Sequence, residues 1–502
     1  MSFRQDRTNP STAISNWKGR TETPKAHPST AISTWLNGGL FGGGDSGWIA
    51  VPSGTNVQMT LYDHDIDSEG NLWCAVTTGD TSNNDAPLIV ILADGTVGAA
   101  NDWKLIDATN TRPSYMRGIC VNGSKVYGAF QLSNVANIQM SYTAGFTPGT
   151  LAPDYHKSYY ENGGRDFYLH SKPIRPWDSD TNMICGYGYN SGYSRFHAYA
   201  SLIGTSDGVV ETGIDSTGDD TILFESGSGS NSVYPGWLCK QDTYFVVGIQ
   251  YQAQRAGYLA QNTANTTNYR QYYTDASGTI QMQGVCPDPD NTTHLYLTAS
   301  TGSNTSAHLT KVAMNGGAVS WTRRIQVDSV SSISSMSAPV TDSDGNIYMV
   351  FAAYDSQSVV DTAYRIHWAK YDNSGAIQQI DSTNTRCLFL SPEHGQGVYG
   401  LQASISADDK FIYITAYNAA NTPIAAKLPL DGSGTQSGAY SVGGKSFYYR
   451  NDVTTTESAG FMSAGGTDGG YVTNTESTQT NVGFNAAAQM GSPAVASEKV
   501  GS

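Results

Sequence analysis

Charged residues are scarce in this sequence of 502 residues. Asp, Glu, Lys and Arg together make up 14% of it, against roughly 25% in ordinary soluble domains. The 28 basic residues face 43 acidic ones, which gives a formal net charge of −15, and the longest basic run is the pair Arg323 and Arg324. Because a surface that follows nucleic-acid phosphates needs clustered cations, the composition argues against a nucleic-acid partner and indicates an uncharged polar surface.

Long apolar runs are also missing. No stretch approaches the roughly 18 consecutive apolar residues of a membrane span, and the opening MSFRQDRTNP lacks the apolar region of a secretory signal. We therefore expect a soluble, unexported chain without membrane insertion. The six cysteines, at positions 74, 120, 185, 239, 286 and 387, form no CxxC pair and no cluster with histidine. This spacing predicts free buried thiols, assembly in a reducing cytoplasm and no metal or other cofactor.

The residues that are abundant favour β-structure. Glycine accounts for 54 residues and tyrosine for 31, and hydrophobic residues make up 39% of the chain. Tyrosine and threonine are enriched in strands, while glycine, asparagine and serine favour turns. The composition predicts an all-β fold with a sizeable core and excludes global disorder.

One pattern recurs seven times: an apolar strand, a turn with Asp or Asn, and a strand that opens with an apolar and an aromatic residue. The clearest copies span residues 65–73, 285–296, 340–348 and 405–413, and the weaker ones span 119–127, 174–186 and 237–244. A second strand–turn–strand pattern follows the better copies, at 88–97, 309–321, 367–377 and 425–432. Each repeat is therefore expected to hold four strands.

The repeats predict the architecture. A single four-stranded sheet cannot bury both of its faces, so radial packing of seven sheets over residues 50–438 is the simplest solution. The sequence Gly345-Asn346-Ile347-Tyr348, followed by Ala369-Lys370-Tyr371-Asp372 and Gly375, resembles the repeats of seven-bladed β-propellers in bacterial and phage surface proteins. The resemblance implies an all-β, seven-bladed β-propeller of four-stranded antiparallel blades, which we assign to residues 47–438.

Two extended segments flank the predicted propeller. The N-terminal arm, residues 1–46, carries the octapeptide PSTAISxW twice, at 10–17 and 28–35. Ile and Trp lie three positions apart in each copy and would share one face of a helical turn, so we predict an anchor that binds a partner through Pro10, Ser11, Ile14, Trp17, Pro28, Ser29, Ile32 and Trp35. The C-terminal segment, residues 439–502, is rich in Ser, Thr and Gly and is expected to pack, extended, on the propeller or a partner.

Asp63, Asp65, Asp67 and Glu69 mimic the opening of a calcium loop. The twelfth position counted from Asp65 is Val76 rather than Glu, so a solvated turn is the preferred interpretation. Two further sets of residues, one aromatic and one of lysines, recur in register. We interpret the aromatic residues as packing between blades and the lysines as features of the repeat, and neither set as ligand-binding groups. They are the aromatic residues Trp73, Tyr127, Tyr244, Tyr296, Tyr348 and Tyr413, and the lysines Lys311, Lys370 and Lys427.

No motif for catalysis is recognisable. The nine histidines are scattered, HExxH is missing, and the turns at Asp67 and Asp342 depart from the Asp-box pattern of sialidases. A glycosidase needs only two carboxylates that the fold brings together. We therefore expect no enzyme, and keep a glycan-cleaving propeller, such as a tail depolymerase, and an intracellular scaffold propeller as alternatives.

The duplicated arm, the uncharged propeller and the missing export signal resemble structural proteins of tailed bacteriophages, especially those of marine hosts. The resemblance implies a non-enzymatic virion structural protein, a tail or appendage component assembled in the host cytoplasm. Its arm would bind other virion proteins within a symmetric oligomer. The polar segments 79–85, 301–306 and 355–361 would offer a face for host-surface glycans or proteins, or for neighbouring subunits.

Overall fold

The structure is a computed structural model, and all of its described residues belong to the unit of residues 47–502. None of the described residues is helical, so no membrane-spanning helix occurs among them. The structure describes residues 47–53, 58–79, 88–101, 103–107, 110–111, 114–135, 138–146, 153–161, 168–190, 195–209, 221–225, 233–251, 255–262, 268–274, 280–301, 306–327, 333–355, 363–380, 388–391, 397–431, 438–450, 455–459, 463–466, 470–474, 477–481, 484–486 and 494–500.

Six antiparallel blades are each built around strands that follow one another in sequence. Blade 1 contains β2 (Gln58–Ile66), β3 (Leu72–Gly79), β4 (Leu88–Ile91) and β5 (Val97–Asn101). Blade 2 contains β8 (Ser114–Asn122), β9 (Lys125–Val135), β10 (Ile138–Phe146) and β11 (Pro153–Glu161). Blade 3 contains β12 (Ile174–Pro176), β13 (Thr181–Asn190), β14 (Arg195–Gly204) and β15 (Thr221–Glu225).

The next three blades follow the same plan. Blade 4 contains β16 (Val233–Gln241), β17 (Tyr244–Tyr251), β18 (Arg255–Asn262) and β19 (Asn268–Thr274). Blade 5 contains β20 (Ile280–Pro287), β21 (His294–Thr301), β22 (Ala307–Ala313) and β23 (Val319–Val327). Blade 6 contains β24 (Ile333–Met336), β26 (Ile347–Asp355), β27 (Ala363–Tyr371) and β28 (Leu388–Ser391), with the short β25 (Val340–Thr341) beside β26.

The last repeat does not complete a blade by itself. Its strands β29 (Val398–Ile405), β30 (Phe411–Asn418) and β31 (Pro423–Pro429) take their fourth strand, β1 (Gly47–Ser53), from the other end of the propeller. Trp48 lies opposite Lys427 in this pairing. We call this composite sheet the closing blade.

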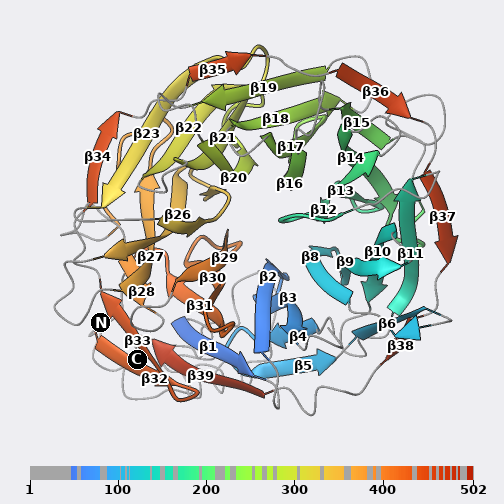
Figure 1. The fold of residues 1–502 in the computed structure, drawn as a ribbon. Helices are drawn as coiled ribbons and strands as arrows, with labels where there is room; N and C mark the ends of the chain where they lie inside the picture. Colours follow the sequence, from blue (N-terminus) through green and yellow to red (C-terminus); the bar gives the residue numbers. More distant parts are fainter. Residues whose placement is uncertain are drawn as a thin grey trace, which may run out of the picture. The chain divides into compact units, whose positions relative to one another are not determined.

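The propeller class is confirmed, but the prediction of seven four-stranded blades is wrong. Six blades are built from consecutive strands, and the last repeat takes its fourth strand from the other end of the propeller. The physical reason is ring closure, because pairing β1 with β31 joins the two ends of the propeller by main-chain hydrogen bonds and leaves neither strand with an open edge there. Figure 1 shows the blades arranged around a central axis, with the first strand of the blades nearest to it.

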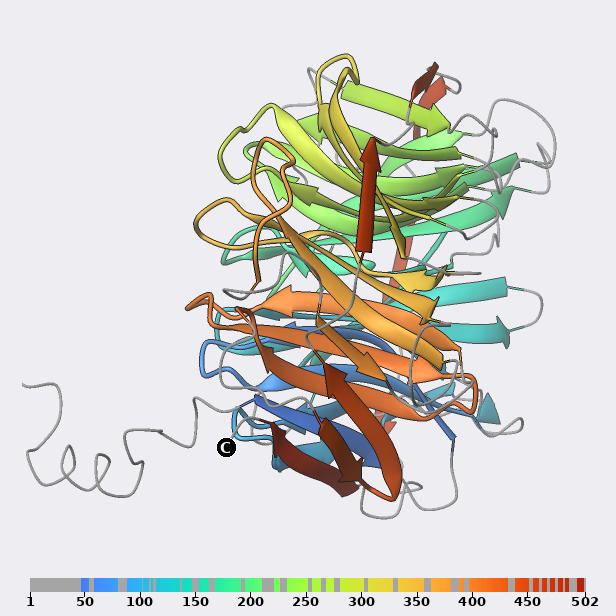
Figure 2. The same ribbon diagram turned by 90° about the vertical axis from the view of Figure 1, so that its left-hand side faces the viewer.

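The C-terminal segment forms a belt around the propeller. Its strands pair with the outermost strands of the blades in reverse order, β33 with β28, β34 with β23, β35 with β19, β36 with β15 and β37 with β11. The belt then pairs β38 with β6 and ends with β39 on β1. Its orange and red strands lie on the outside of the blades in both ribbon views (Figures 1 and 2).

The strands of this C-terminal belt have the following bounds: β32 (Gly438–Val442), β33 (Lys445–Arg450), β34 (Thr455–Ala459), β35 (Ser463–Gly466), β36 (Gly470–Asn474), β37 (Ser477–Asn481), β38 (Phe484–Ala486) and β39 (Ala494–Val500). The belt meets β6 (Trp103–Asp107), which follows blade 1 in the sequence and also pairs with β7 (Asn110–Thr111). Main-chain pairing does not need large side chains. A segment of Ser, Thr and Gly can therefore cover the blade edges.

The aromatic residues that recur in register pack inside the propeller, as predicted. Tyr296 lies in one apolar cluster with residues of blade 6, and Tyr348 in another with residues of the closing blade. Tyr413 packs with blade 1 and donates a hydrogen bond to the carbonyl of Gly70 at 3.0 Å. Large rings at this strand position fill the space between neighbouring sheets. The others are the buried Trp73 and Tyr127 and the half-buried Tyr244.

The three lysines in register are also repeat features. The ammonium group of Lys311 lies 2.7 Å from a carboxylate oxygen of Asp288 and 5.3 Å from the ring centroid of Tyr296. Lys370 repeats this arrangement with Asp342 and Tyr348, and Lys427 donates to the carbonyl of Ala93 at 3.1 Å. These lysines are committed to the turns of the repeat.

The five described cysteines are free, as predicted. Four are buried and Cys239 is half-buried, and burial raises the pKa of each of these thiols. Cys387 lies outside the described residues. No group of His, Cys, Asp or Glu suited to a metal ion occurs in the described part of the chain.

Candidate functional site: a central pocket

The first strands of the blades bulge near the propeller axis. In β2, β8, β16, β20, β24 and β29 the pairing with the next strand shifts by one residue, so that each inner strand carries an extra one. In β20 the extra residue is Gln283, between Met282 and Gly284. A bulge bends its strand and re-aims side chains. The same irregularity, repeated around the ring, therefore builds a site at the axis.

Glycine permits the close approach of these inner strands. A Cβ atom at Gly284 would lie 2.1 Å from the Cα of Ala338, which follows β24, and one at Gly236 would lie 2.5 Å from the carbonyl oxygen of Ser171. Any larger residue at these positions would force neighbouring strands apart. The walls around the axis are therefore fixed by packing.

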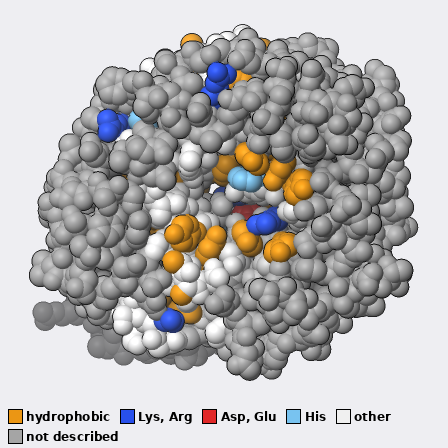
Figure 3. Space-filling model, viewed as in Figure 1, with side chains coloured by type: hydrophobic (Ala, Val, Ile, Leu, Met, Phe, Trp, Pro, Cys, Tyr) orange, Lys and Arg blue, Asp and Glu red, His pale blue; other side chains and the backbone are white. Residues whose placement is uncertain are grey.

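The bulged segments enclose a cavity of about 370 Å³, which we call the central pocket. This volume lies at the lower end of the range for small-ligand sites. Figure 3 shows this face hollowed at its centre, where hydrophobic side chains and a histidine gather. The described lining residues are His170, Ser171, Tyr234, Trp237, Gln250, Gln281, Met282, Gln283, Ser335, Met336, Gly400, Leu401 and Gln402.

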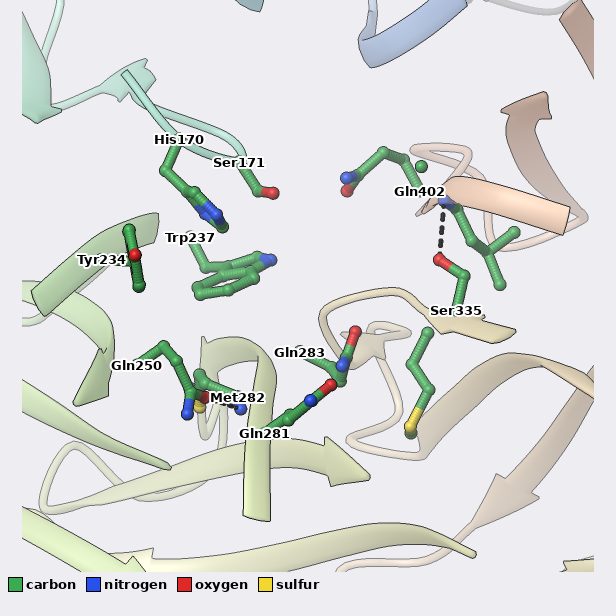
Figure 4. Close-up of a pocket in the computed structure, with 13 residues that line it drawn as sticks. His170, Ser171, Tyr234, Trp237, Gln250, Gln281, Met282, Gln283, Ser335 and Gln402 are labelled. Atoms are coloured by element: carbon green, nitrogen blue, oxygen red, sulfur yellow. Dashed lines mark hydrogen bonds between the residues drawn. The ribbon is translucent and has the colours of Figure 1, made fainter. Parts of the chain in front are cut away.

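Aromatic rings form one wall of the central pocket. The ring centroid of His170 lies 5.5 Å from that of Trp237 and 5.7 Å from that of Tyr234. Trp237 has a positive φ of 52°, a strained conformation for a large residue. Its amide donates to the carbonyl of Ser171 at 2.8 Å, and this bond helps to hold the strained turn. Figure 4 shows the indole nitrogen directed into the cavity.

Amides and hydroxyls line the rest of the cavity together with apolar side chains. The amide of Leu401 donates to the hydroxyl of Ser335 at 3.1 Å (Figure 4), and Gln250 bridges β17 and β20 by donating to Ile280 and accepting from the amide of Met282. Gln402 is 4% exposed, and its Oε1 has no hydrogen-bond partner among the described residues. Its amide points across the cavity toward Ser171 (Figure 4). A buried acceptor of this kind needs a donor, and a ligand in the pocket can provide it.

The lining carries no net charge at neutral pH. Burial, together with the positive charge of Arg117, lowers the pKa of His170 to about 4, so its imidazole is neutral above that pH. No Asp, Glu, Lys or Arg occurs among the described lining residues. The pocket is thus suited to an uncharged group that has both an apolar face and hydroxyls.

A buried ionic network lies beside the central pocket. The carboxylate of Asp63 on β2 accepts two hydrogen bonds from the guanidinium of Arg175 on β12, both at 3.0 Å, and one from the amide of Ile119 on β8 at 3.2 Å. The neighbouring Lys172 donates to the carbonyl of Ala403 at 3.3 Å. Burial and the charge of Arg175 lower the pKa of Lys172 to about 8. The network ties blades 1, 2 and 3 to the closing blade.

The prediction of a single solvated turn at Asp63, Asp65, Asp67 and Glu69 needs a correction. Asp63 is fully buried, and Asp65 accepts from the amide of Val121 at 2.7 Å. Burial is the main cause that raises the pKa of Asp65. Only Asp67 and Glu69 belong to the turn, where Asp67 accepts from the amide of Asn71 at 2.9 Å. The alternation of β2 places its two acids near the axis and not on one loop.

The residues predicted to bind a partner are not among those described. Pro10, Ser11, Ile14, Trp17, Pro28, Ser29, Ile32 and Trp35 all lie in residues 1–46, outside the described residues, and so do 80–87, 302–305 and 356–362, which hold most of the three polar segments.

The central pocket is not among the sites predicted from the sequence. A signal was present in the pattern Met-x-Gly-(Ile/Val)-Cys, at residues 116–120 and 282–286, whose second residue is the bulged one in each case. A bulge breaks the two-residue alternation of a strand. In the sequence alone the pattern therefore indicates an irregular strand, and the bulge is recognised only when the pairing of the strands is known.

Comparisons with known proteins found likenesses only among solved structures. No family model matches the sequence, and no curated protein matches it. The Dos1 propeller is 8% identical, with a TM-score of 0.39, over 75% of this chain and 94% of that one. The NanB sialidase of Streptococcus pneumoniae is 9% identical, with a TM-score of 0.39, over 80% of this chain and 70% of that one. Drosophila Plexin A, in complex with Semaphorin 1b, is 9% identical, with a TM-score of 0.36, over 76% of this chain and 86% of that one.

Proposed function

We propose that this chain is a non-enzymatic binding protein whose central pocket holds a sugar unit of a surface glycan. The observation that carries the proposal is the lining, which combines aromatic rings on one wall with amides and hydroxyls around the cavity and holds no carboxylate among its described residues. A sugar has apolar C–H faces that pack on aromatic rings, and hydroxyls that pair with amides. The cavity of about 370 Å³ suits a terminal unit rather than a long segment of a chain.

Individual groups have assignable roles in this proposal. Trp237 and Tyr234 offer ring surface for the apolar face of the sugar, and the neutral His170 offers a ring nitrogen, Nδ1, that has no hydrogen-bond partner among the described residues. The buried Oε1 of Gln402 accepts a hydrogen bond from a sugar hydroxyl. Satisfying a buried acceptor adds about 1 kcal/mol to binding, and it also discriminates against ligands without that hydroxyl.

The nearby acidic residues favour binding over cleavage, because their carboxylates are already engaged in hydrogen bonds within the protein. Glycoside hydrolysis by the common mechanism needs two carboxyl groups that flank the bond. Asp63 is bound by Arg175 and Ile119, and Asp65 by Val121 and Ile66. These acids hold strands together and are not free to act on a ligand in the central pocket.

The setting that we propose is a tailed-bacteriophage virion, where the chain would be a tail or appendage component in a symmetric oligomer. The support is the duplicated octapeptide of residues 10–17 and 28–35. Two copies of one peptide can dock on repeated pockets of a partner, and tethering makes the second docking intramolecular. The propeller would then display its central pocket toward host-surface glycans.

The test is glycan-array binding by the full chain, followed by calorimetry. Trp237→Leu and Gln402→Leu should each weaken binding about 10-fold or more, equivalent to at least about 1.4 kcal/mol, while Trp177→Leu, a half-buried tryptophan outside the pocket, should not. Binding of no glycan at millimolar concentration would refute the proposal. Release of sugar from a bound glycan would favour the glycan-cleaving alternative.

A further inference from the structure

Beside the central pocket, Arg117 presents a cation held between aromatic rings. Its guanidinium carbon lies 4.4 Å from the ring centroid of Tyr62 and 5.2 Å from that of Tyr115. Arg117 is the bulged residue of β8, and Tyr62 is the bulged residue of β2. The same irregularity that shapes the pocket therefore brings these residues together. We call this group of three residues the arginine clamp.

No anionic partner of Arg117 occurs among the described residues. Arg117 forms no ion pair and no hydrogen bond with a described residue, and its Nε is buried without a partner among them. The acids of the adjacent strand are occupied, Asp63 by Arg175 and Asp65 by the amide of Val121. A guanidinium with unused, partly desolvated donors is a strong site for an anion, since charge-assisted hydrogen bonds gain strength away from water.

The arginine clamp is continuous with the walls of the central pocket. On one side Tyr62 lies 6.2 Å from Tyr417, and Tyr417 packs so closely on Gly400 that a Cβ there would lie 2.5 Å from its ring. Gly400 lines the pocket. On the other side, the charge of Arg117 contributes to the lowered pKa of His170, which also lines the pocket. These contacts place the arginine clamp next to the central pocket.

We infer that the arginine clamp is a subsite for an anionic substituent, a carboxylate or a sulfate, on the glycan whose neutral part occupies the central pocket. The inference rests on the proposed glycan binding and adds the chemical class of the ligand. The planar guanidinium matches two oxygens of such a group, and the flanking tyrosines fix its plane in advance. Lysine would supply the charge without this paired geometry.

The experiment measures dissociation constants of the full chain for three matched oligosaccharides, one neutral, one carboxylated and one sulfated. The wild type should bind at least one acidic member about 10-fold more tightly than the neutral one, the gain expected of a charge-assisted hydrogen bond. Arg117→Gln should bring this ratio close to one, and Arg117→Lys should restore only part of it. The control is Lys240→Gln, which removes a cation 4.3 Å from the ring of Trp177, outside the pocket, and should leave the ratio unchanged.

The two ideas fail in different ways. Equal wild-type affinity for the neutral and acidic members would overturn the anionic subsite and leave the proposed glycan binding standing. An unchanged ratio in a folded Arg117→Gln protein, as judged by circular dichroism, would place the anion elsewhere and also overturn it. Binding of none of the three would count against the proposed function itself. The two acidic arms distinguish a carboxylate from a sulfate.

Discussion

The ionic network beside the central pocket gives the sharpest test of how the propeller is held together. Asp63 is fully buried and accepts two hydrogen bonds from Arg175 and one from the amide of Ile119. Asp63→Asn keeps the shape but leaves a largely buried guanidinium without its counter-charge. Removing one partner of a buried ion pair costs about 3–5 kcal/mol, so we expect a loss of that size in the free energy of unfolding.

The assay is chemical denaturation followed by tryptophan fluorescence. The control is Lys125→Ala, which breaks a pair with Asp154 whose side chains are 39% and 28% exposed. Such pairs are worth less than about 1 kcal/mol. The double variant Asp63→Leu with Arg175→Met should lose less than the sum of the single changes, because it leaves no unpaired charge. If Asp63→Asn costs no more than Lys125→Ala, the pair does not tie the blades and our reasoning about the axis is wrong.

Three further predictions concern the belt, the buried lysine and the arm. Deleting residues 438–502 should open the outer edges of blades 2 to 6. The deletion should speed amide hydrogen exchange in β11 and β23 while glycan binding persists. Unchanged exchange in these strands would contradict the claim that the belt covers them. Because the pKa of Lys172 is lowered from 10.5 to about 8, the native state loses its proton first as the pH rises. Wild-type stability should therefore increase, relative to Lys172→Met, by about 3 kcal/mol between pH 8 and 10.5, and parallel pH profiles in denaturant would exclude this. Deleting residues 1–40 should leave a folded propeller that no longer joins its assembly, and normal incorporation on gradients would refute the anchor.

The C-terminal belt on the outer edge of the propeller shows how much of the structure can be predicted from the sequence alone. The Ser-, Thr- and Gly-rich composition of residues 439–502 predicts extended structure, because these residues neither build a core nor favour a helix. The partners of this segment could not be predicted. Main-chain pairing uses groups that every residue carries, so nothing in the side chains specifies that β34 pairs with β23, or that the belt passes the blades in reverse order.

The repeats by themselves determined the propeller class, the aromatic packing between blades and the role of the lysines, because the same residue types return at the same position of successive sheets. Tyr348 and Lys370 belong to one repeat and meet across adjacent strands. Closure by β1, the pair of Asp63 with Arg175, and the arginine clamp were decided only by tertiary structure. They join residues from different blades, at distances along the chain that no local pattern records. The central pocket was also decided by tertiary structure. It is built by strand bulges, which interrupt the alternation of side chains by which a strand is recognised in a sequence.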